Sequence, residues 1–337
     1  MIANFLIIYF AFSLVLVGIC KQYNLLVDNK IEKHKKYSST LKSYSIGGIL
    51  LIFFFSYYLI FISENYSFLL FLISIFSIGL LSDLRKIHSV STRFFLQIIL
   101  IAFFIYLLKT QIISTKIVFF DQLLQNNFVN ILFVTFCITI LINGVNFIDG
   151  LNGLAIKYHL IIYLVIMLYF SEFVFETQLI NYMVIVLFTL LIFNLSGYLY
   201  LGDSGSYLLS LFTGFFLIEF SNANPAISPY FIIVLLWYPC FELLFSMIRR
   251  FLKKKETYKP DTEHLHQLFF KFISKNLKIK NKLAEHIVVS LGINLYNLFT
   301  ILISVNFIYN SEVLILILFS NIFFYISIFY FLKRKNY

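Results

Sequence analysis

Long apolar segments, separated by shorter polar stretches, follow one another along the whole chain. An α-helix needs about 20 predominantly apolar residues to cross the hydrocarbon core of a membrane. The pattern predicts an all-α fold, a polytopic integral membrane bundle of about eleven transmembrane helices. The segments that approach the required length are residues 2–20, 45–62, 67–82, 94–109, 128–145, 154–171, 178–196, 204–220, 228–248, 288–309 and 312–332. Ten is the alternative count because the third and fourth segments are short, and residues 110–127 could hold a re-entrant or surface helix.

The composition supports a membrane protein and excludes several other classes. Of the 337 residues, 61% are hydrophobic and 12% are charged, whereas a soluble domain carries about 25% charged residues. This balance excludes a soluble enzyme, a disordered protein and a nucleic-acid binder with a basic surface. The three cysteines lie in apolar segments and show neither a metal-ligand spacing nor a disulfide framework. The first apolar segment lacks the basic region and cleavage site of a signal peptide, so we expect a retained helix.

The cations indicate how the chain is oriented. With the N-terminus outside, the inner loops are residues 21–44, 83–93, 146–153, 197–203 and 249–287, followed by a tail from residue 333. Of the 26 Lys and Arg residues, only Lys109 and Lys116 then fall on the outer side. Because cytoplasmic loops are enriched in Lys and Arg, we expect the C-terminus and these loops to be cytoplasmic. The net charge of +10 is then mainly topological, although an anionic substrate would find the same face attractive.

Two polar segments interrupt the apolar pattern at expected inner helix ends. Residues 143–153 read NGVNFIDGLNG, and glycines allow a backbone to approach a ligand closely. Spacing alone favours an ordinary hinge here, with Asp149 or Asn152 capping the following helix. Residues 200–206 read YLGDSGS; a carboxylate at a helix start suits a cation–phosphate site, and the alternative is that Asp203 is merely the N-cap. A carboxylate so near hydrocarbon, without a cation in its own loop, favours the functional interpretation.

Two further segments carry candidate residues. Residues 260–266 read PDTEHLH, and His264 and His266 could bind a metal, donate to a phosphate or be solvated loop residues. For two histidines alone the solvated alternative is favoured. Asp83 ends the third apolar segment, where the helix dipole disfavours a carboxylate. It could form a surface ion pair with Arg85, but its unfavourable place makes it a candidate functional acid.

The order of these features is more specific than any of them alone. Along the chain come His34, the Gly47–Gly48 pair, Asp83, then NGVNFIDGLNG, YLGDSGS and PDTEHLH. In this order they resemble the polyprenyl-phosphate N-acetylhexosamine-1-phosphate transferases, a family of the glycosyltransferase family 4 type that includes the phospho-MurNAc-pentapeptide translocase. The resemblance covers nearly the whole chain. It implies a single transmembrane catalytic domain over residues 1–337, with the inner loops forming the active site.

The resemblance also implies roles for individual residues. Asp203 matches a Mg²⁺ ligand, with Mn²⁺ as an alternative ion, and Tyr200 matches an aromatic position that stacks on uracil. Asp83 matches a residue proposed to act on the lipid phosphate. The positions implied in catalysis are Asp83, Asp149, His264 and His266, and those implied in substrate binding are Lys42, Asn146, Asp149, Gly150, Asn152, Asn194 and Tyr200. Of these, His264 and His266 match a motif that contacts the diphosphate or the sugar.

Several positions depart from the family pattern. Ser82 stands where the first Asp of an acidic pair is usual, Asn152 replaces the second Asp of DGxDG, and Gln267 replaces a further His. The first inner loop is longer and lacks a Pro before Gly47. These differences leave open whether activity is impaired or only retuned.

The implied activity is the transfer of an N-acetylhexosamine-1-phosphate from a UDP-sugar to undecaprenyl phosphate, with release of UMP. It would start cell-surface polysaccharide synthesis at the cytoplasmic face of a bacterial inner membrane. The implied partners are the UDP-sugar, undecaprenyl phosphate and the bilayer, with no nucleic acid, and a homodimer stays open. The alternatives are a transporter or flippase for an anionic lipid or sugar, and a catalytically inactive relative. Acids at inner helix ends and the lack of an internal repeat argue against a transporter.

Overall fold

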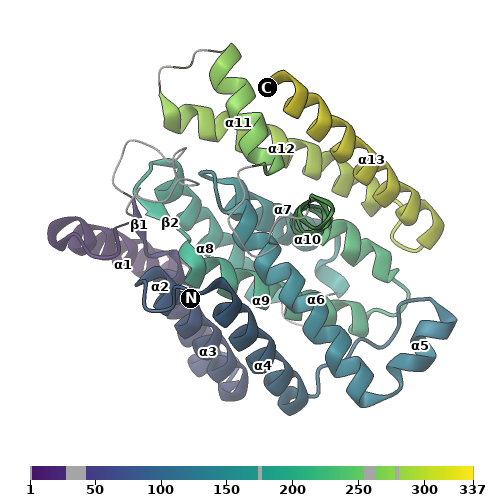
Figure 1. Ribbon diagram of the computed structural model, residues 1–337. Helices are drawn as coiled ribbons and strands as arrows, with labels where there is room; N and C mark the ends of the chain where they lie inside the picture. The colour runs from purple at the N-terminus through teal and green to yellow at the C-terminus, as the bar shows by residue number, and fades with distance from the viewer. Residues whose placement is uncertain are drawn as a thin grey trace.

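The chain forms a bundle of α-helices in the computed structural model shown in Figure 1. The structure describes residues 2–27, 43–173, 177–253, 263–277, 279 and 281–336. Each expected apolar segment has a helix as its counterpart: α1 (Ile2–Tyr23), α2 (Gly47–Phe61), α3 (Tyr66–Asp83), α4 (Val90–Leu108), α6 (Asn127–Ile148), α7 (Leu154–Tyr169), α8 (Thr177–Leu195), α9 (Gly202–Ala223), α10 (Pro229–Leu252), α12 (Lys282–Val305) and α13 (Ser311–Asn336). The smaller elements are α5 (Val118–Leu124), the 3₁₀ turn η2 (Ser171–Phe173), α11 (Leu265–Asn276), and the strands β1 (Tyr44–Ser45) and β2 (Leu199–Tyr200).

The helices confirm an all-α, polytopic membrane protein. Within the described residues, eight helices are long and apolar enough to cross a membrane, and α2 and α7 are apolar but shorter. Helix α9 carries several hydroxyl residues and is buried along most of its length. The short helix α5 lies within residues 110–127, where a surface or re-entrant helix was expected. The exact number of crossings and their orientation stay predictions.

Loop contacts fall into two separate sets, as alternating crossings require. The loops expected inside contact one another, through Ser43 with Gly197, Asp83 with Asp203, and Asn152 with His286. The loops expected outside also contact one another, through Asn130 with Ile112, Asn222 with Gln111, and Ser228 with Ser311. Helices α4, α9 and α12 therefore each run from one set of loops to the other.

Helix α9 packs against α2 and α3 through glycines. A Cβ atom added at Gly79 of α3 would lie within 3.0 Å of the backbone of Asp203 and Ser204. One added at Gly48 of α2 would lie within 3.0 Å of Ser204 and of the backbone of Gly205. Because no side chain separates these backbones, the first turn of α9 is held between α2 and α3.

A two-stranded parallel sheet fixes the chain just before α2 and α9. Tyr44 pairs with Leu199 and Ser45 with Tyr200. The Ser43 hydroxyl donates to the carbonyl oxygen of Gly197 at 2.7 Å, and the Gly48 N–H donates to that of Leu201 at 3.3 Å. These bonds hold the entrance to α2 beside the turn that leads into α9.

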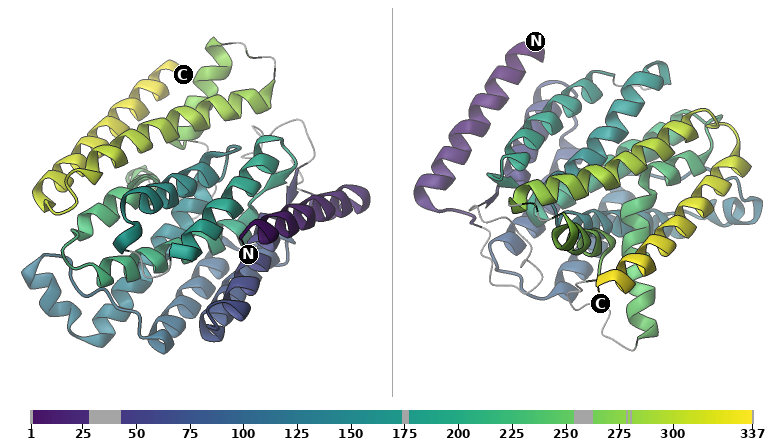
Figure 2. Two further views of the ribbon diagram at one scale, coloured as in Figure 1. Left: turned by 180° about the vertical axis from the view of Figure 1, so that it is seen from behind. Right: turned by 90° about the horizontal axis from the view of Figure 1, so that it is seen from above.

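Helices α12 and α13 form a C-terminal hairpin on one side of the bundle, opposite α1, as Figures 1 and 2 show. Helix α11 packs against both α12 and α13 at their inner ends. The Asn336 side chain donates to the carbonyl oxygen of Leu268, and the Lys333 amine to the Glu263 carboxylate. Helix α11 is therefore anchored to the end of α13.

Gly79→Ala should destabilise the protein, because the new methyl group meets backbone atoms that cannot rotate away. Overpacking of this kind costs about 1–3 kcal/mol. Gly18→Ala is the matched control, since Gly18 is also helical but has nothing within 4 Å of an added Cβ. Thermal unfolding in detergent should show a lower midpoint for Gly79→Ala alone, and equal midpoints for the two variants would contradict the close packing.

Candidate functional site

Asp83 joins the end of α3 to the start of α9. Its Oδ1 accepts a hydrogen bond from the Asp203 N–H at 2.8 Å. Its Oδ2 accepts from the Ser204 N–H at 3.0 Å and from the Ser204 hydroxyl at 2.6 Å. A carboxylate is disfavoured at the C-terminus of its own helix but stabilised at the N-terminus of another. Asp83 therefore caps α9, with both carboxylate oxygens bonded to the start of that helix.

Gly202 makes this cap sterically possible. Its φ of +71° lies in the left-handed region, which glycine adopts without strain. A Cβ atom here would also lie 2.7 Å from one Asp83 oxygen. The glycine before Asp203 is therefore needed both for the turn and for the approach of Asp83.

Asp203 stands in the first turn of α9 and is the centre of a polar network. Its Oδ1 accepts from the Asn146 side-chain amide at 2.8 Å. Its Oδ2 contacts the Arg93 guanidinium and the Ser82 hydroxyl. Asp203 is not the N-cap, which is Leu201, so its side chain is available to this network. About a quarter of the side chain, 24%, is exposed, so a ligand can reach the carboxylate.

The sequence analysis missed Arg93 and Ser206. Arg93 lies in the first turn of α4 and contacts both Ser82 and Asp203. Ser206 accepts a hydrogen bond from the Asn146 side-chain amide at 3.0 Å. Arg93 had been counted only among the cations that set the orientation of the chain. Its position at a helix start, opposite loops that carry the acids, was the available signal.

The two histidines of the PDTEHLH segment are buried, so the expectation of solvated loop residues is wrong. His264 precedes α11 and His266 lies in its first turn, and they are 6% and 1% exposed. Their rings stack with centroids 5.6 Å apart and 7° between the planes. His264 Nδ1 lies 3.0 Å from a carboxylate oxygen of Glu242, a residue that the sequence analysis also missed.

His266 faces the glycine turn after α6. A Cβ atom added at Gly150 would lie 2.9 Å from Nε2 of His266. Burial lowers the pKa of His266 from 6.5 to about 3, although the charge of Glu242 opposes this. The ring is therefore neutral, and neither nitrogen has a hydrogen-bond partner within the described part of the chain. Because buried polar groups are rarely left unpaired, these nitrogens support a polar ligand beside Gly150.

The inner end of α6 connects the Asp203 network with the histidine pair. Asn146 donates to Asp203, and the next residue, Phe147, contacts the His264 ring edge-on at 5.0 Å. The Arg250 guanidinium lies 5.9 Å from the centroid of the Phe147 ring. Carboxylate, guanidinium and imidazole groups from four helices therefore surround one helix end.

Asn152 and Asn194 lie behind this surface. They are 0% and 1% exposed. The Asn152 amide donates to the Asn194 carbonyl oxygen at 2.6 Å, and its oxygen lies 2.9 Å from His286 Nδ1. Asn194 accepts from the Gly153 N–H and donates to the Leu199 carbonyl oxygen. Both residues tie the glycine turn to the turn before α9, and a direct substrate contact for either stays a prediction.

The other predicted residues fall at different places. Asp149 is the C-cap of α6 and is half-buried, whereas the N-cap of α7 is Gly153, so capping of α7 by Asp149 or Asn152 is wrong. Tyr200 is half-buried in β2. Lys42, like His34 and Asp261, lies outside the described residues.

A second charged group lies where α10, α11 and α13 meet. The Glu263 carboxylate bonds to Arg249 at 3.1 Å, Lys253 at 3.0 Å and Lys333 at 2.7 Å. Partial burial would raise the pKa of Glu263, but hydrogen bonds from Lys333 and Lys253 outweigh it and lower this pKa from 4.5 to about 2. A depressed carboxyl pKa stabilises the fold above the unfolded value, about 4.3, and this contribution is lost as the pH falls toward 2. The ion pairs of Glu263 with these three cations therefore persist at neutral pH.

The donor atoms around Asp203 fit a Mg²⁺ ion that is held partly by a ligand. Mg²⁺ prefers oxygen ligands and commonly uses one or two carboxylates together with substrate phosphates. Asp203 supplies a carboxylate, with the Ser82 hydroxyl and the Asn146 amide beside it. Within the described residues, no group of three or more His, Cys, Asp or Glu could hold a metal ion. Phosphate oxygens would therefore have to complete the coordination.

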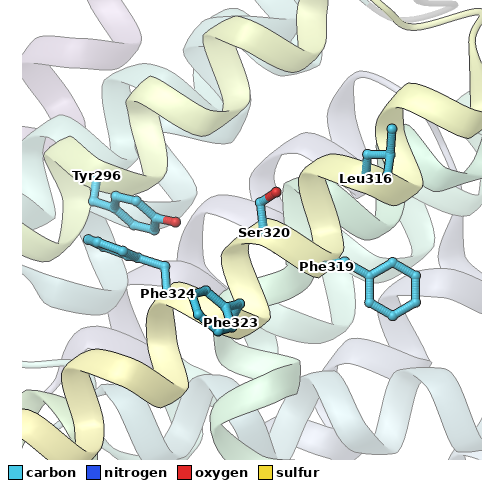
Figure 3. Close-up of a pocket in the computed structure, with 6 residues that line it drawn as sticks. All are labelled: Tyr296, Leu316, Phe319, Ser320, Phe323 and Phe324. Atoms are coloured by element: carbon cyan, nitrogen blue, oxygen red, sulfur yellow. The ribbon is translucent and has the colours of Figure 1, made fainter.

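An apolar groove lies apart from these polar residues, between α12 and α13, as Figure 3 shows. It is lined by Tyr296, Leu316, Phe319, Ser320, Phe323 and Phe324. Phe319 and Phe323 are 66% and 75% exposed. Such a surface on two spanning helices suits contact with lipid chains and carries no reactive group.

Replacing Asp83 should loosen the start of α9. Asp83→Ala removes the acceptor for three donors, and loss of a helix cap costs about 0.5–2 kcal/mol. Asp83→Asn keeps one acceptor oxygen and should lose less. Thermal unfolding in detergent should rank the midpoints as wild type, Asn variant, Ala variant, with Glu172→Ala, at an exposed acid of the expected outer side, as a reference for loss of a surface acid. An unchanged midpoint for Asp83→Ala would contradict the capping role.

The comparisons with known proteins agree with this geometry. Residues 65–221 match glycosyl transferase family 4. The chain is also 27% identical, over 231 residues, to the undecaprenyl-phosphate alpha-N-acetylglucosaminyl 1-phosphate transferase of Thermotoga maritima, covering 68% of this chain and 69% of that protein. The matched range contains Asp83, Arg93, Asn146 and Asp203. These matches support the resemblance drawn from the sequence, and the similarity to glycosyl transferase family 4 lies in residues 65–221.

Proposed function

We propose that this protein transfers an N-acetylhexosamine-1-phosphate from a UDP-sugar to undecaprenyl phosphate, with release of UMP. The observation that carries the proposal is the partly exposed Asp203 carboxylate at the start of α9, within one network with Ser82, Arg93 and Asn146. The acceptor and the type of sugar are supported by the name of the Thermotoga maritima relative, an undecaprenyl-phosphate alpha-N-acetylglucosaminyl 1-phosphate transferase. The UDP carrier rests on the family resemblance.

The reaction itself demands little covalent chemistry from the protein. A terminal oxygen of the lipid phosphate attacks the sugar-linked phosphorus, a new P–O bond forms, and the bond to the UMP oxygen breaks. Phosphoryl transfer of this type depends mainly on positioning and charge neutralisation. A phosphomonoester has a second pKa of about 6 and is largely dianionic at neutral pH. A strong protein base is therefore unnecessary.

Residues of this chain can supply the positioning and the positive charge. The Arg93 guanidinium stands at the carboxylate that would meet the diphosphate, and guanidinium groups bind phosphates in a bidentate manner. His266 presents two unpartnered nitrogens beside Gly150. Asp83 acts by holding the first turn of α9, because its two oxygens already accept three hydrogen bonds. The loss of a second acid at Ser82 is then tolerated, since Ser82 donates to Asp203 instead.

Asp203 would hold a Mg²⁺ ion together with phosphate oxygens of the substrate. When bound, the ion supplies charge neutralisation at the diphosphate. Arg93 shares the same carboxylate, so it keeps Asp203 oriented and its charge balanced. Placement of the site on the cytoplasmic face follows from the expected orientation of the chain.

Purified protein should release UMP from a UDP-N-acetylhexosamine when undecaprenyl phosphate and Mg²⁺ are present. A panel of UDP-GlcNAc, UDP-GalNAc and deoxy N-acetylhexosamine donors identifies the sugar. Asp203→Asn should lower kcat by about 100-fold or more, because charge stabilisation at the reacting phosphates is lost. Glu219→Gln, an exposed acid farther along α9, is the control and should keep full activity.

The assay also separates the alternatives. If wild-type protein released no UMP with any donor yet moved a lipid or sugar across vesicles, the transporter hypothesis would replace this proposal. No UMP and no transport would indicate an inactive relative. Full Mg²⁺-dependent transfer by Asp203→Asn would show that the metal assignment is wrong.

Substitution of Arg93 should lower the transfer activity as much as substitution of Asp203. Arg93→Gln removes the cation at the Asp203 carboxylate and should lower kcat by about 100-fold or more. Arg93→Lys keeps the charge but not the planar fork, so it should be intermediate. Lys86→Gln, at an exposed cation of the same inner loop, provides the comparison for a general loss of positive charge. Equal activities of Arg93→Gln and Lys86→Gln would leave Arg93 with only a topological role.

A further inference from the structure

Glu242 is a carboxylic acid buried inside a membrane-spanning helix. It lies on α10 and is 0% exposed. Ionisable residues at such positions are costly and usually have a function. One oxygen, Oε1, lies 3.0 Å from His264 Nδ1 and 3.4 Å from the Leu265 N–H, and the other accepts from the Tyr325 hydroxyl at 2.7 Å. These three partners lie on elements that pack against α10: His264 and Leu265 at the start of α11, and Tyr325 on α13.

The His264 ring is held from several sides, and its side-chain hydrogen bonds are made at one nitrogen, Nδ1. Nδ1 faces Glu242 and also lies 3.2 Å from the Ser246 hydroxyl. One ring face stacks on His266, and Phe147 contacts the ring edge-on. Among the residues that the structure describes, the two side chains that bond to the ring, Glu242 and Ser246, both do so at Nδ1. A carboxylate on one nitrogen of a histidine determines which nitrogen carries the proton.

We propose that Glu242 is a positioning residue for the transfer reaction: it holds the proton of His264 on Nδ1 and so directs Nε2, as an acceptor, toward the donor substrate. This inference rests on the proposed function for its substrate, but the histidine geometry can be measured without it. It also makes α13 part of the site, because Tyr325 bonds to the second oxygen of Glu242.

The charged groups around His264 leave this pairing undisturbed. On α10, Arg249 bonds to Glu263, and Arg250 donates to the Ser246 carbonyl oxygen. From α13, Lys333 also bonds to Glu263. His266, on α11, is neutral because burial lowers its pKa to about 3. Within the described part of the chain, the carboxylate of Glu242 bonds to His264, Leu265 and Tyr325.

Two substitutions at Glu242 separate positioning from packing. Glu242→Leu removes the acceptor but keeps an apolar side chain of similar size, whereas Glu242→Gln keeps an acceptor oxygen. The Leu variant should lower kcat by about 10–100-fold, the loss typical of removing an orienting partner. The Gln variant should retain much of the activity. Tyr325→Phe should lie between wild type and the Leu variant.

Nitrogen NMR of ¹⁵N-histidine-labelled full-length protein in detergent reads the proton directly, and the chain has only 6 histidines to assign. Wild type should show His264 protonated at Nδ1, and Glu242→Leu should lose this preference. Glu285→Gln is the matched control, since Glu285 is 6% exposed and accepts from Ser274 of α11. This control should leave the His264 signals unchanged.

The outcomes distinguish a failure of the proposed function from a failure of the positioning role of Glu242. If wild type shows no transfer but His264 keeps its proton on Nδ1 only when Glu242 is present, the proposed function fails and the positioning stands. If Glu242→Leu leaves the His264 signals unchanged, the positioning is overturned, whether or not kcat falls. A loss of activity with unchanged signals and a lower thermal midpoint would assign Glu242 to packing alone.

Discussion

The bond between the Asp83 carboxylate and the first turn of α9 is the constraint on which the rest of the site depends. Two helix ends of opposite dipole meet at one carboxylate, so a position that is unfavourable for α3 becomes favourable for α9. The cap fixes the direction in which α9 enters the bundle, and therefore where Asp203 points. The glycines at 48, 79 and 202 make room for that approach.

The two acids of the site, Asp83 and Asp203, have different hydrogen-bond and charge partners. Asp83 is occupied by backbone and hydroxyl donors, and Asp203 is shared by Arg93, Ser82 and Asn146. An anionic substrate could not approach two bare carboxylates, because like charges at close range repel. Since the α9 N-terminus offsets Asp83 and Arg93 offsets Asp203, the surface can accept phosphate groups. The substitution at Ser82 fits this balance, because a second acid there would add negative charge beside Asp203.

The sequence alone predicted the features that depend on local patterns, namely the helices and several residues of the candidate site. The apolar segments marked every long helix, and the polar segments YLGDSGS and PDTEHLH led to Asp203 and to the histidine pair. The partners of these residues were not predictable from spacing, since Arg93 and Asp203 lie 110 residues apart and meet only through helix packing. Glu242 was hidden within an apolar run, and the burial of Asn152 and Asn194 behind the site could not be read from the sequence. Single-residue chemistry is visible in a sequence, but the pairing of residues across a bundle requires the fold.

The histidine pair belongs to a part of the molecule that the family match does not cover. Residues 65–221 contain the Asp203 network, whereas His264 depends on Glu242 of α10 and, through it, on Tyr325 of α13. Glu263 adds a second link, because Lys253 and Lys333 bring the ends of α10 and α13 to the start of α11. The two parts touch at the inner end of α6, where Asn146 faces Asp203 and Phe147 faces His264. A displacement of the C-terminal hairpin would therefore move the imidazoles relative to the Asp203 carboxylate, so the geometry of the candidate site depends on helices far from the matched residues.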